Sequence, residues 1–415
     1  MKEIGDILGR NQNFRKLWLA SILSETGTAT SMVALPLYVM GTTHSYALAG
    51  IVVSAGMIGH LVVRGPAGYV ADRWTRRPLL MSGAIIASIL MAVVAASVLW
   101  HPSAQYWLIG IAWTLLGFVG AGLSPVQSAA LRSTLVDDEV QQGMSAWQSQ
   151  YAGTMLVGPL VGGLLYTVSP VLPFALDAVS FLVEFLVLAS LRSSLGGGYD
   201  LPSGAGEVTL GIRAVLKSRF LRVYSLTNAL VNVASEGIIY AAIFWMTALG
   251  GVSVGVGFAI LGVGSLLGSL MAVRLKSTRY QLMMASYAAL FALVGFVGFV
   301  SYTPWIVIGL AAVAGALSQP PVIALGSHIM TRVPQEAMGR VEGGMSMIGS
   351  VFYPFGAAVT GVVAHVWSLG GAFAFWGALC CVPLIAATFR TWRLPAGGLD
   401  WGEVTSLQET PATGQ

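Results

Sequence analysis

Long apolar stretches alternate with short polar ones along almost the whole chain. Each stretch has about 20 residues, the length that a helix needs to cross a hydrocarbon core of about 30 Å. The pattern predicts twelve transmembrane helices, near residues 17–40, 47–67, 78–99, 105–131, 146–168, 171–191, 223–248, 252–273, 281–301, 304–330, 344–367 and 371–389. The expected fold class is therefore an all-α integral membrane protein.

The basic residues test this count and predict an orientation. With a cytoplasmic N-terminus, 20 of the 21 lysines and arginines fall in inner loops or terminal segments, and Arg64 lies just inside the inner end of segment 47–67. Cytoplasmic loops of membrane proteins carry such an excess of positive charge. An error of one helix would scatter the later charges over both faces. The pattern predicts a multi-pass protein of the cell membrane with both termini cytoplasmic.

Composition excludes a water-soluble class. Hydrophobic residues make up 56% of the 415 residues and charged residues only 9%, against about 25% charged in soluble domains. The net charge of +4 follows membrane topology and does not indicate a nucleic-acid partner. We expect the lipid bilayer as the environment, a monomer, and neither a cofactor nor a metal.

The two halves of the sequence resemble each other at offsets of 195 to 200 residues. The matches are Val136–Glu139 with Val333–Glu336, Pro125-Val126 with Pro321-Val322, Pro159 with Pro354, Phe174-Ala175 with Phe373-Ala374, and Gly68 with Gly268 as turns after the second and eighth segments. Parallel repeats of this kind place a substrate site near the membrane midplane between the halves. We therefore predict a six-helix half at 1–191, a cytoplasmic linker at 192–222, a second six-helix half at 223–390 and a cytoplasmic tail at 391–415.

The loop after segment 47–67 carries a glycine, an acid and three arginines at fixed spacing: Gly68, Asp72, Arg73, Arg76 and Arg77. This pattern, G-x-x-x-D-R-x-x-R-R, resembles the signature loop of the major facilitator superfamily. The resemblance implies that these five residues form a gate latch, in which a carboxylate pairs with arginine and helix amides until a conformational change breaks the contact. A basic loop that merely follows topology would explain the arginines but not the glycine or the acid.

Segment 146–168 contains Gly158, Pro159, Gly162 and Gly163. These residues resemble the core of the superfamily's antiporter motif, although Thr154 stands where that motif has a further glycine. A Gly-Pro step with flanking glycines gives a helix that bends and packs closely. Ordinary helix packing by small residues is the alternative interpretation.

Four further stretches resemble the macrolide-efflux and enterobactin-exporter branch of that superfamily: Asn13–Trp18, Ala34–Leu37, Asp177–Phe181 and Gly339–Val341. One position departs from the branch, which usually has Gly-Asp in its first helix. Here Gly27 is followed by Thr28, and Glu25 is the nearby acid. The residue that couples transport to protons is therefore left open by the resemblance.

Ionisable residues inside predicted spans are candidates for function, because burying them in lipid costs a few kcal/mol. Glu25 and Glu236 lie in the first and seventh segments, which usually line the cavity in this superfamily, and both are candidates for proton coupling or cation recognition. A structural hydrogen bond to a neighbouring hydroxyl is the alternative. Asp177 is a further candidate for which a structural role is favoured, and Glu184, seven residues later, shares its helix face.

Secondary transport is the function that these observations favour. The leading hypothesis is proton-coupled efflux of a drug-like or natural-product small molecule by alternating access. An importer or uniporter of a small nutrient is the second hypothesis, since fold does not fix direction. A membrane-embedded enzyme is a remote third, because the sequence has no H-E-x-x-H, G-x-S-x-G or Walker A pattern.

Overall fold

The computed structural model describes residues 7–63, 74–101, 105–136, 139–191, 195, 212–213, 215–217, 219–272, 280–300, 303–317, 341, 344–345 and 347–388. All regular secondary structure in these ranges is helical, which confirms the expected fold class. The helices are α2 (Gln12–Thr43), α3 (Tyr46–Val63), α5 (Arg76–Trp100), α6 (Gln105–Ser133), α7 (Val140–Val168), α8 (Leu172–Ala189), α10 (Arg219–Thr247), α11 (Gly251–Ala272), α12 (Tyr280–Val300), α15 (Tyr353–Val366) and α16 (Leu369–Thr388). Residues 304–317 are helical as well.

Many of these helices are long and apolar enough to cross a bilayer. Eight meet that condition within the described ranges, and three further apolar helices are shorter there, at Ala289–Val300, Pro304–Leu317 and Leu369–Cys381. The chain is thus a multi-pass membrane protein. The number twelve and the orientation of the termini stay predictions.

Local sequence signals set the ends of α2. Asn11 precedes the helix, and its side-chain oxygen accepts a hydrogen bond from the backbone N–H of Phe14 at 2.9 Å, which satisfies one orphan donor of the first turn. The helix ends at His44, a non-glycine residue with φ of 52° whose N–H bonds the carbonyl of Met40. Such a left-handed residue closes a helix by pairing one of its last carbonyls.

Contacts between residues divide the chain into two compact units. The first unit holds Met1–Pro202 with Ile243–Gly262, and the second holds Ser203–Ala242 with Val263–Gln415. The last turn of α10 and the first half of α11 therefore belong to the first unit. The predicted division into two six-helix halves joined by the linker 192–222 remains a prediction.

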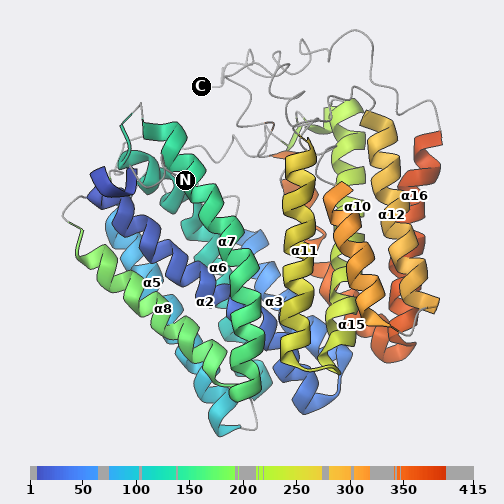
Figure 1. The fold of residues 1–415 in the computed structure, drawn as a ribbon, viewed down its shortest axis with the longest axis horizontal. Helices are drawn as coiled ribbons and strands as arrows, with labels where there is room; N and C mark the ends of the chain where they lie inside the picture. The colour runs from blue at the N-terminus through green and yellow to red at the C-terminus, as the bar shows by residue number, and fades with distance from the viewer. Residues whose placement is uncertain are drawn as a thin grey trace, which may run out of the picture. The chain divides into compact units, whose positions relative to one another are not determined.

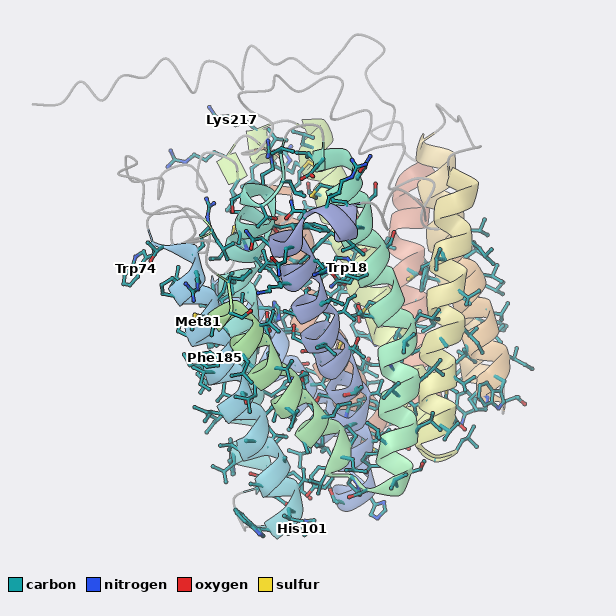
Figure 2. All side chains as sticks on the ribbon, turned by 60° about the vertical axis from the view of Figure 1, so that its left-hand side comes forward. Trp18, Trp74, Met81, His101, Phe185 and Lys217 are labelled. Carbon is teal, nitrogen blue, oxygen red and sulfur yellow. The ribbon has the colours of Figure 1, made fainter. Side chains whose placement is uncertain are left out.

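In the first unit, α2 packs against α7 and α8, α3 against α6, and α5 against both α6 and α8 (Figure 1). Figure 2 shows Trp74 and His101 at the two ends of α5. The outward faces of these helices carry large apolar side chains, such as Trp107 and Val168, which are 78% and 77% exposed. An apolar exterior of this kind suits lipid as the solvent.

In the second unit, α12 and α15 pack against α16 (Figure 1). Small residues allow the closest approaches, as where a Cβ on Gly295 would lie 2.5 Å from the Cα of Gly377. Gly268 lies inside α11, where its Cα faces Ala316. Its expected place in a turn after the eighth segment is therefore wrong, because close packing against the helix at 304–317, rather than a turn, uses this glycine.

Candidate functional site

The first unit holds three acidic side chains that the sequence indicates as candidates for function. Glu25 is on α2, and Asp177 and Glu184 are on α8, which packs directly against α2. The Glu25 carboxyl interacts electrostatically with both acids of α8. The predicted candidates Glu25 and Asp177, and with them Glu184, therefore lie on two adjacent helices, near enough for Glu25 to interact electrostatically with the other two.

Asp177 is fully buried where α2 and α8 cross. A Cβ on Gly27 would lie 2.7 Å from Asp177 Oδ1, so the two helices meet here without room for a side chain on α2. Asp177 Oδ1 accepts long hydrogen bonds of 3.5 Å from the hydroxyls of Thr28 and Ser180, and the Ser180 hydroxyl also donates to the Asp177 carbonyl at 2.7 Å. Asp177 Oδ2 is buried with no hydrogen-bond partner in the part of the chain that the structure describes. Asp177 thus packs directly against α2 at Gly27.

In the second unit, a tryptophan packs against a glycine. Trp376 lies 199 residues after Asp177, the offset at which Phe174-Ala175 repeats. A Cβ on Gly237 of α10 would collide with the Trp376 ring, and the ring N–H donates to the Thr360 hydroxyl at 2.7 Å. Asp177 and Trp376 thus each lie against a glycine of a neighbouring helix in their own unit. The close contact with Gly27 favours a helix-joining role for Asp177.

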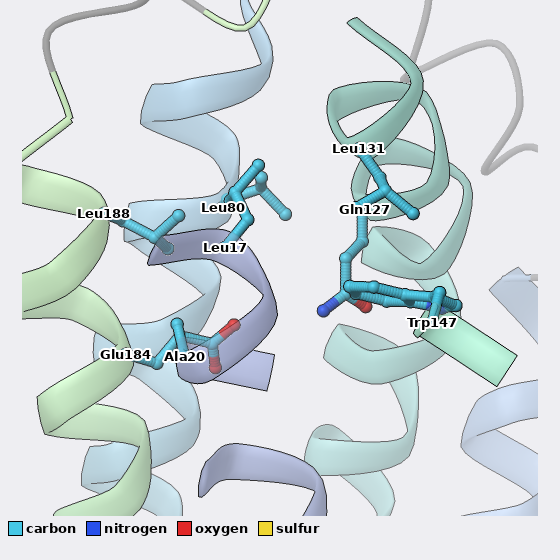
Figure 3. A pocket seen from close by; sticks show the side chains of 8 residues that line it. All are labelled: Leu17, Ala20, Leu80, Gln127, Leu131, Trp147, Glu184 and Leu188. Carbon is cyan, nitrogen blue, oxygen red and sulfur yellow. The ribbon is translucent and has the colours of Figure 1, made fainter. Parts of the chain in front are cut away.

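Glu184 lines a small cavity in the first unit (Figure 3). The lining residues come from five helices and are Leu17, Ala20, Leu80, Gln127, Leu131, Trp147, Glu184 and Leu188. The space in the cavity that is open to the centre of a water molecule is about 10 Å³, which is close to what a single water needs. Figure 3 shows the Glu184 carboxyl beside Ala20, and Gln127 beside the Trp147 ring. No basic side chain is among these eight residues.

A hydrogen-bonded group of uncharged polar residues adjoins this cavity. Gln150 on α7 donates to the Ser21 hydroxyl at 2.7 Å, and the amide of Gln127 lies 3.5 Å from the same oxygen. Gln150 Oε1 is buried without a partner among the described residues. These three residues were not predicted from the sequence. The signal that marks them is an uncharged polar side chain inside a largely apolar helix.

Glu236 in the second unit lies where α10 meets α15. A Cβ on Gly356 would lie 2.9 Å from the Cβ of Glu236, so the backbones approach closely at this point. Tyr240, one turn later and buried, interacts electrostatically with Glu236. Glu25 interacts in the same way with Tyr151 of α7. Each unit therefore places a half-buried glutamate near a tyrosine.

Arg77, one of the predicted gate-latch residues, binds the end of α8. Its Nε donates to the carbonyl of Leu188 at 3.1 Å and its Nη2 to that of Ala189 at 2.8 Å. Lys16 at the start of α2 donates to the carbonyl of Ser190 at 3.2 Å. The last carbonyls of a helix lack partners within it and carry partial negative charge, so two cations stabilise this end.

Arg76 is buried and ties α5 to two other segments. Its Nη1 lies 3.3 Å from the carbonyls of Ala129 on α6 and Leu195 beyond α8. The Ser133 hydroxyl also donates to the Leu195 carbonyl, at 3.0 Å. Leu195 is 1% exposed and has a φ of 60°. Leu195, near the start of the predicted linker, is thus bound to α5 and α6 through its carbonyl.

The remaining predicted gate-latch residues, Gly68, Asp72 and Arg73, lie outside the described residues. Within the first unit, Arg77 binds carbonyls at the end of α8, and Arg76 binds the carbonyls of Ala129 on α6 and of Leu195. A pairing with Asp72 stays a prediction.

We expect Arg77→Ala to lower the stability of the purified protein by about 1 kcal/mol, because two α8 carbonyls lose charged donors at a partly exposed site. Thermal unfolding in detergent measures this loss. Arg77→Lys keeps a cation that reaches one carbonyl at a time, so its loss should be smaller. Equal stability of Arg77→Ala and the wild type would contradict the capping role.

The glycines of the antiporter-like helix pack α7 on two sides. Towards α2, a Cβ on Gly158 would collide with Ala29, and a Cβ on Gly162 would lie 2.6 Å from the Thr30 carbonyl oxygen. Towards the first half of α11, Gly163 faces Gly251. Pro159 lies inside the helix, and its carbonyl oxygen would be 2.6 Å from a Cβ on Gly255 of α11. This segment therefore joins α2, α7 and α11 by backbone-to-backbone contact.

Comparison with known proteins places this architecture among transporters. The chain is 25% identical over 416 residues to the multidrug efflux pump Tap of Mycobacterium tuberculosis, covering 93% of this chain and 95% of that protein. It is 23% identical over 349 residues to the enterobactin exporter EntS of Shigella boydii, covering 81% and 82%. The crystal structure of the nucleoside transporter NupG matches with a TM-score of 0.74 at 12% identity, over 92% of this chain and 99% of that one, and so shares the fold. The family model of the major facilitator superfamily matches residues 17–341, and the chain belongs to this superfamily of membrane transporters.

Proposed function

We propose that this transporter exports a drug-like or natural-product small molecule in exchange for protons, by alternating access. The observation that carries the proposal is the pair of half-buried glutamates, Glu25 on α2, within the predicted first span, and Glu236 in the part of α10 that is apolar enough to cross a membrane, each near a tyrosine. A carboxyl group buried in a membrane is energetically costly, so its presence there indicates a function. Gaining or losing a proton changes its charge as its access to water changes. The exporter names of two relatives support the direction.

The proposal includes a cytoplasmic location for both termini, the plasma membrane as the site and a monomer as the active form. The one-sided distribution of the 21 basic residues supports the orientation. The gate latch would close the cytoplasmic side, with Arg76 held by the carbonyls of Ala129 and Leu195, Arg77 held by the end of α8, and Asp72 as their switchable partner.

Two assays test the function. Cells with and without the protein, exposed to chemically diverse antibiotics, should differ in growth for at least one compound, which then serves as the test compound. Inverted membrane vesicles with a trapped pH dye should show proton movement when that compound is added. Absence of compound-driven proton movement, with transport intact, would overturn antiport and leave a uniporter.

We expect Glu25→Gln and Glu236→Gln to lose compound-driven proton movement, by about a hundredfold for the residue that exchanges the proton. The amide keeps the size of the side chain but cannot carry a transferable acidic proton. Vesicles containing equal amounts of each variant provide the measurement, and Glu403→Gln, in the C-terminal polar segment, serves as the control. If both variants move protons like the wild type, the coupling residues lie elsewhere.

A further inference from the structure

We propose that Glu184 is a second proton-exchanging carboxyl of the transport cycle, which passes protons between Glu25 and water in the cavity that Glu184 lines. The inference rests on the proposed proton coupling and assigns a path to it within the first unit. It follows from three features: the place of the carboxyl, the lining of the cavity and the link to Glu25.

The first feature is depth. Glu184 is one helical turn before Leu188, whose carbonyl is bound by Arg77, so its carboxyl lies about 6 Å along α8 from the charged end of the helix. Ala20 lies beside Glu184 in Figure 3 and is five residues before Glu25, about 7.5 Å along α2. Glu184 therefore stands between the charged end of the unit and the deeper acid.

The second feature is the cavity. Leucines and an alanine form most of its wall, and the lining residues with polar groups are Glu184, Gln127 and Trp147. Such a space is large enough for about one water, and a water needs polar partners, which these groups provide. Through Ser21, Gln127 connects to Gln150, whose Oε1 is a buried acceptor with no partner among the described residues. A water here would let the carboxyl exchange protons.

The third feature is the link to Glu25. Ser24 precedes Glu25 on α2, which packs against α8, and its hydroxyl lies near enough to Glu184 to interact with that carboxyl. The bonds of this hydroxyl to its own helix are long, 3.3 Å to the Ala20 carbonyl and 3.4 Å to the Ser21 carbonyl. A hydroxyl that donates one proton and accepts another can join two carboxyls.

Among the residues that the structure describes, few charged or titratable groups surround Glu184. From α2 it faces Glu25, and from α7 Tyr151 acts on that same glutamate. Leu80 of α5 and Gln127 of α6 line its cavity and do not titrate. Asp177 shares its helix and lies two turns deeper. A proton is thus the charge-balancing partner that this arrangement supplies for either glutamate.

Proton balance in the cycle is simple. When protonated Glu25 meets ionised Glu184, the proton leaves one carboxyl oxygen and binds the other, so Glu25 becomes the carboxylate and Glu184 the neutral acid. Glu184 then gives the proton to water in the cavity, which carries it to the cytoplasmic side, and returns to the carboxylate. One proton moves inward, and no other reactant is consumed.

A spectroscopic test of this proposal requires only a change of pH and no transported compound. Infrared difference spectra of the full-length protein in lipid, recorded between alkaline and acid pH, should contain a carboxylic-acid carbonyl band that disappears in Glu184→Gln. A band assigned to Glu25 by its absence from Glu25→Gln should shift its pH midpoint in Glu184→Gln. Spectra of Glu184→Gln that match the wild type in both respects would overturn the proposal.

A transport test separates this proposal from the proposed function. With the test compound from the susceptibility screen, Glu184→Gln should lose pH-driven accumulation in inverted vesicles by about a hundredfold, while exchange of labelled for unlabelled compound without a pH gradient continues. Ser24→Ala should slow the pH-driven process, whereas Ser82→Ala, an exposed hydroxyl of α5 bonded to its own helix, should not. Full pH-driven accumulation in Glu184→Gln would overturn the assignment. If the wild type itself shows no pH-driven accumulation, the proposed coupling fails, whatever Glu184 does.

Discussion

Gly162→Val is expected to abolish transport and to reduce strongly the amount of folded protein in the membrane. A Cβ at this position would lie 2.6 Å from the carbonyl oxygen and 2.8 Å from the Cα of Thr30, and both are backbone atoms that cannot move aside. The helices α2 and α7 would have to separate along their contact. Overpacking of this kind costs about 1–3 kcal/mol or more, and here it also displaces the helix that carries Glu25.

The same helix offers a matched control. Gly153 lies on α7, nine residues before Gly162, and a Cβ there would meet no other atom within 4 Å. Gly153→Val should therefore insert and transport like the wild type. Size-exclusion profiles of tagged protein and growth in the test compound measure the two effects. Normal folding and transport in Gly162→Val would show that the α2–α7 contact tolerates a gap.

Asp177→Leu should destabilise the first unit, whereas Asp177→Asn should fold and keep proton-coupled transport. Leucine removes the acceptor for the Thr28 and Ser180 hydroxyls and adds branched bulk beneath Gly27. Interhelical hydrogen bonds in membranes contribute about 0.6 kcal/mol each, so the steric conflict should dominate. Asparagine keeps the shape and an acceptor oxygen but cannot exchange an acidic proton.

This pair of variants separates structure from coupling. Thermal unfolding measures the first effect and compound-driven proton movement the second. In the second unit, Trp376→Leu removes the corresponding contact beneath Gly237 and the bond to Thr360, and should also lower stability. A folded Asp177→Asn variant without proton movement would instead make Asp177 a coupling residue.

The helical fold could be predicted because a membrane span is identified from its own sequence, without knowledge of the segments that pack against it. A run of about 20 apolar residues must satisfy its own backbone in lipid, and only a helix does so within one segment. Pro125 and Pro159 interrupt such runs without breaking them, since α6 and α7 continue through both. The packing between helices was harder to predict from the sequence. The repeat predicts a turn at Gly268, whereas its contact with Ala316 shows that this glycine allows two helices to pack closely.

The acidic residues of the candidate site could be predicted from the sequence, but its uncharged polar residues could not. An ionisable residue in an apolar run is conspicuous by its cost, so Glu25, Asp177, Glu184 and Glu236 could all be named from the sequence. Gln127 and Gln150 carry no such cost and resemble ordinary polar positions. Their connection through Ser21 depends on three helices meeting, a fact of packing that no single segment contains.

By itself, the sequence determined the helical class, the candidate acids and the resemblance to a transporter superfamily, because hydrophobic length, charge and local motifs act within one segment. The tertiary structure alone decided what those residues touch. It placed Asp177 against Gly27, paired Arg76 with the Leu195 carbonyl and Arg77 with the end of α8, and set Glu184 on a cavity. The physical reason is that side chains from segments more than a hundred residues apart acquire partners only when the helices pack, and in lipid that packing depends on small residues at particular crossings.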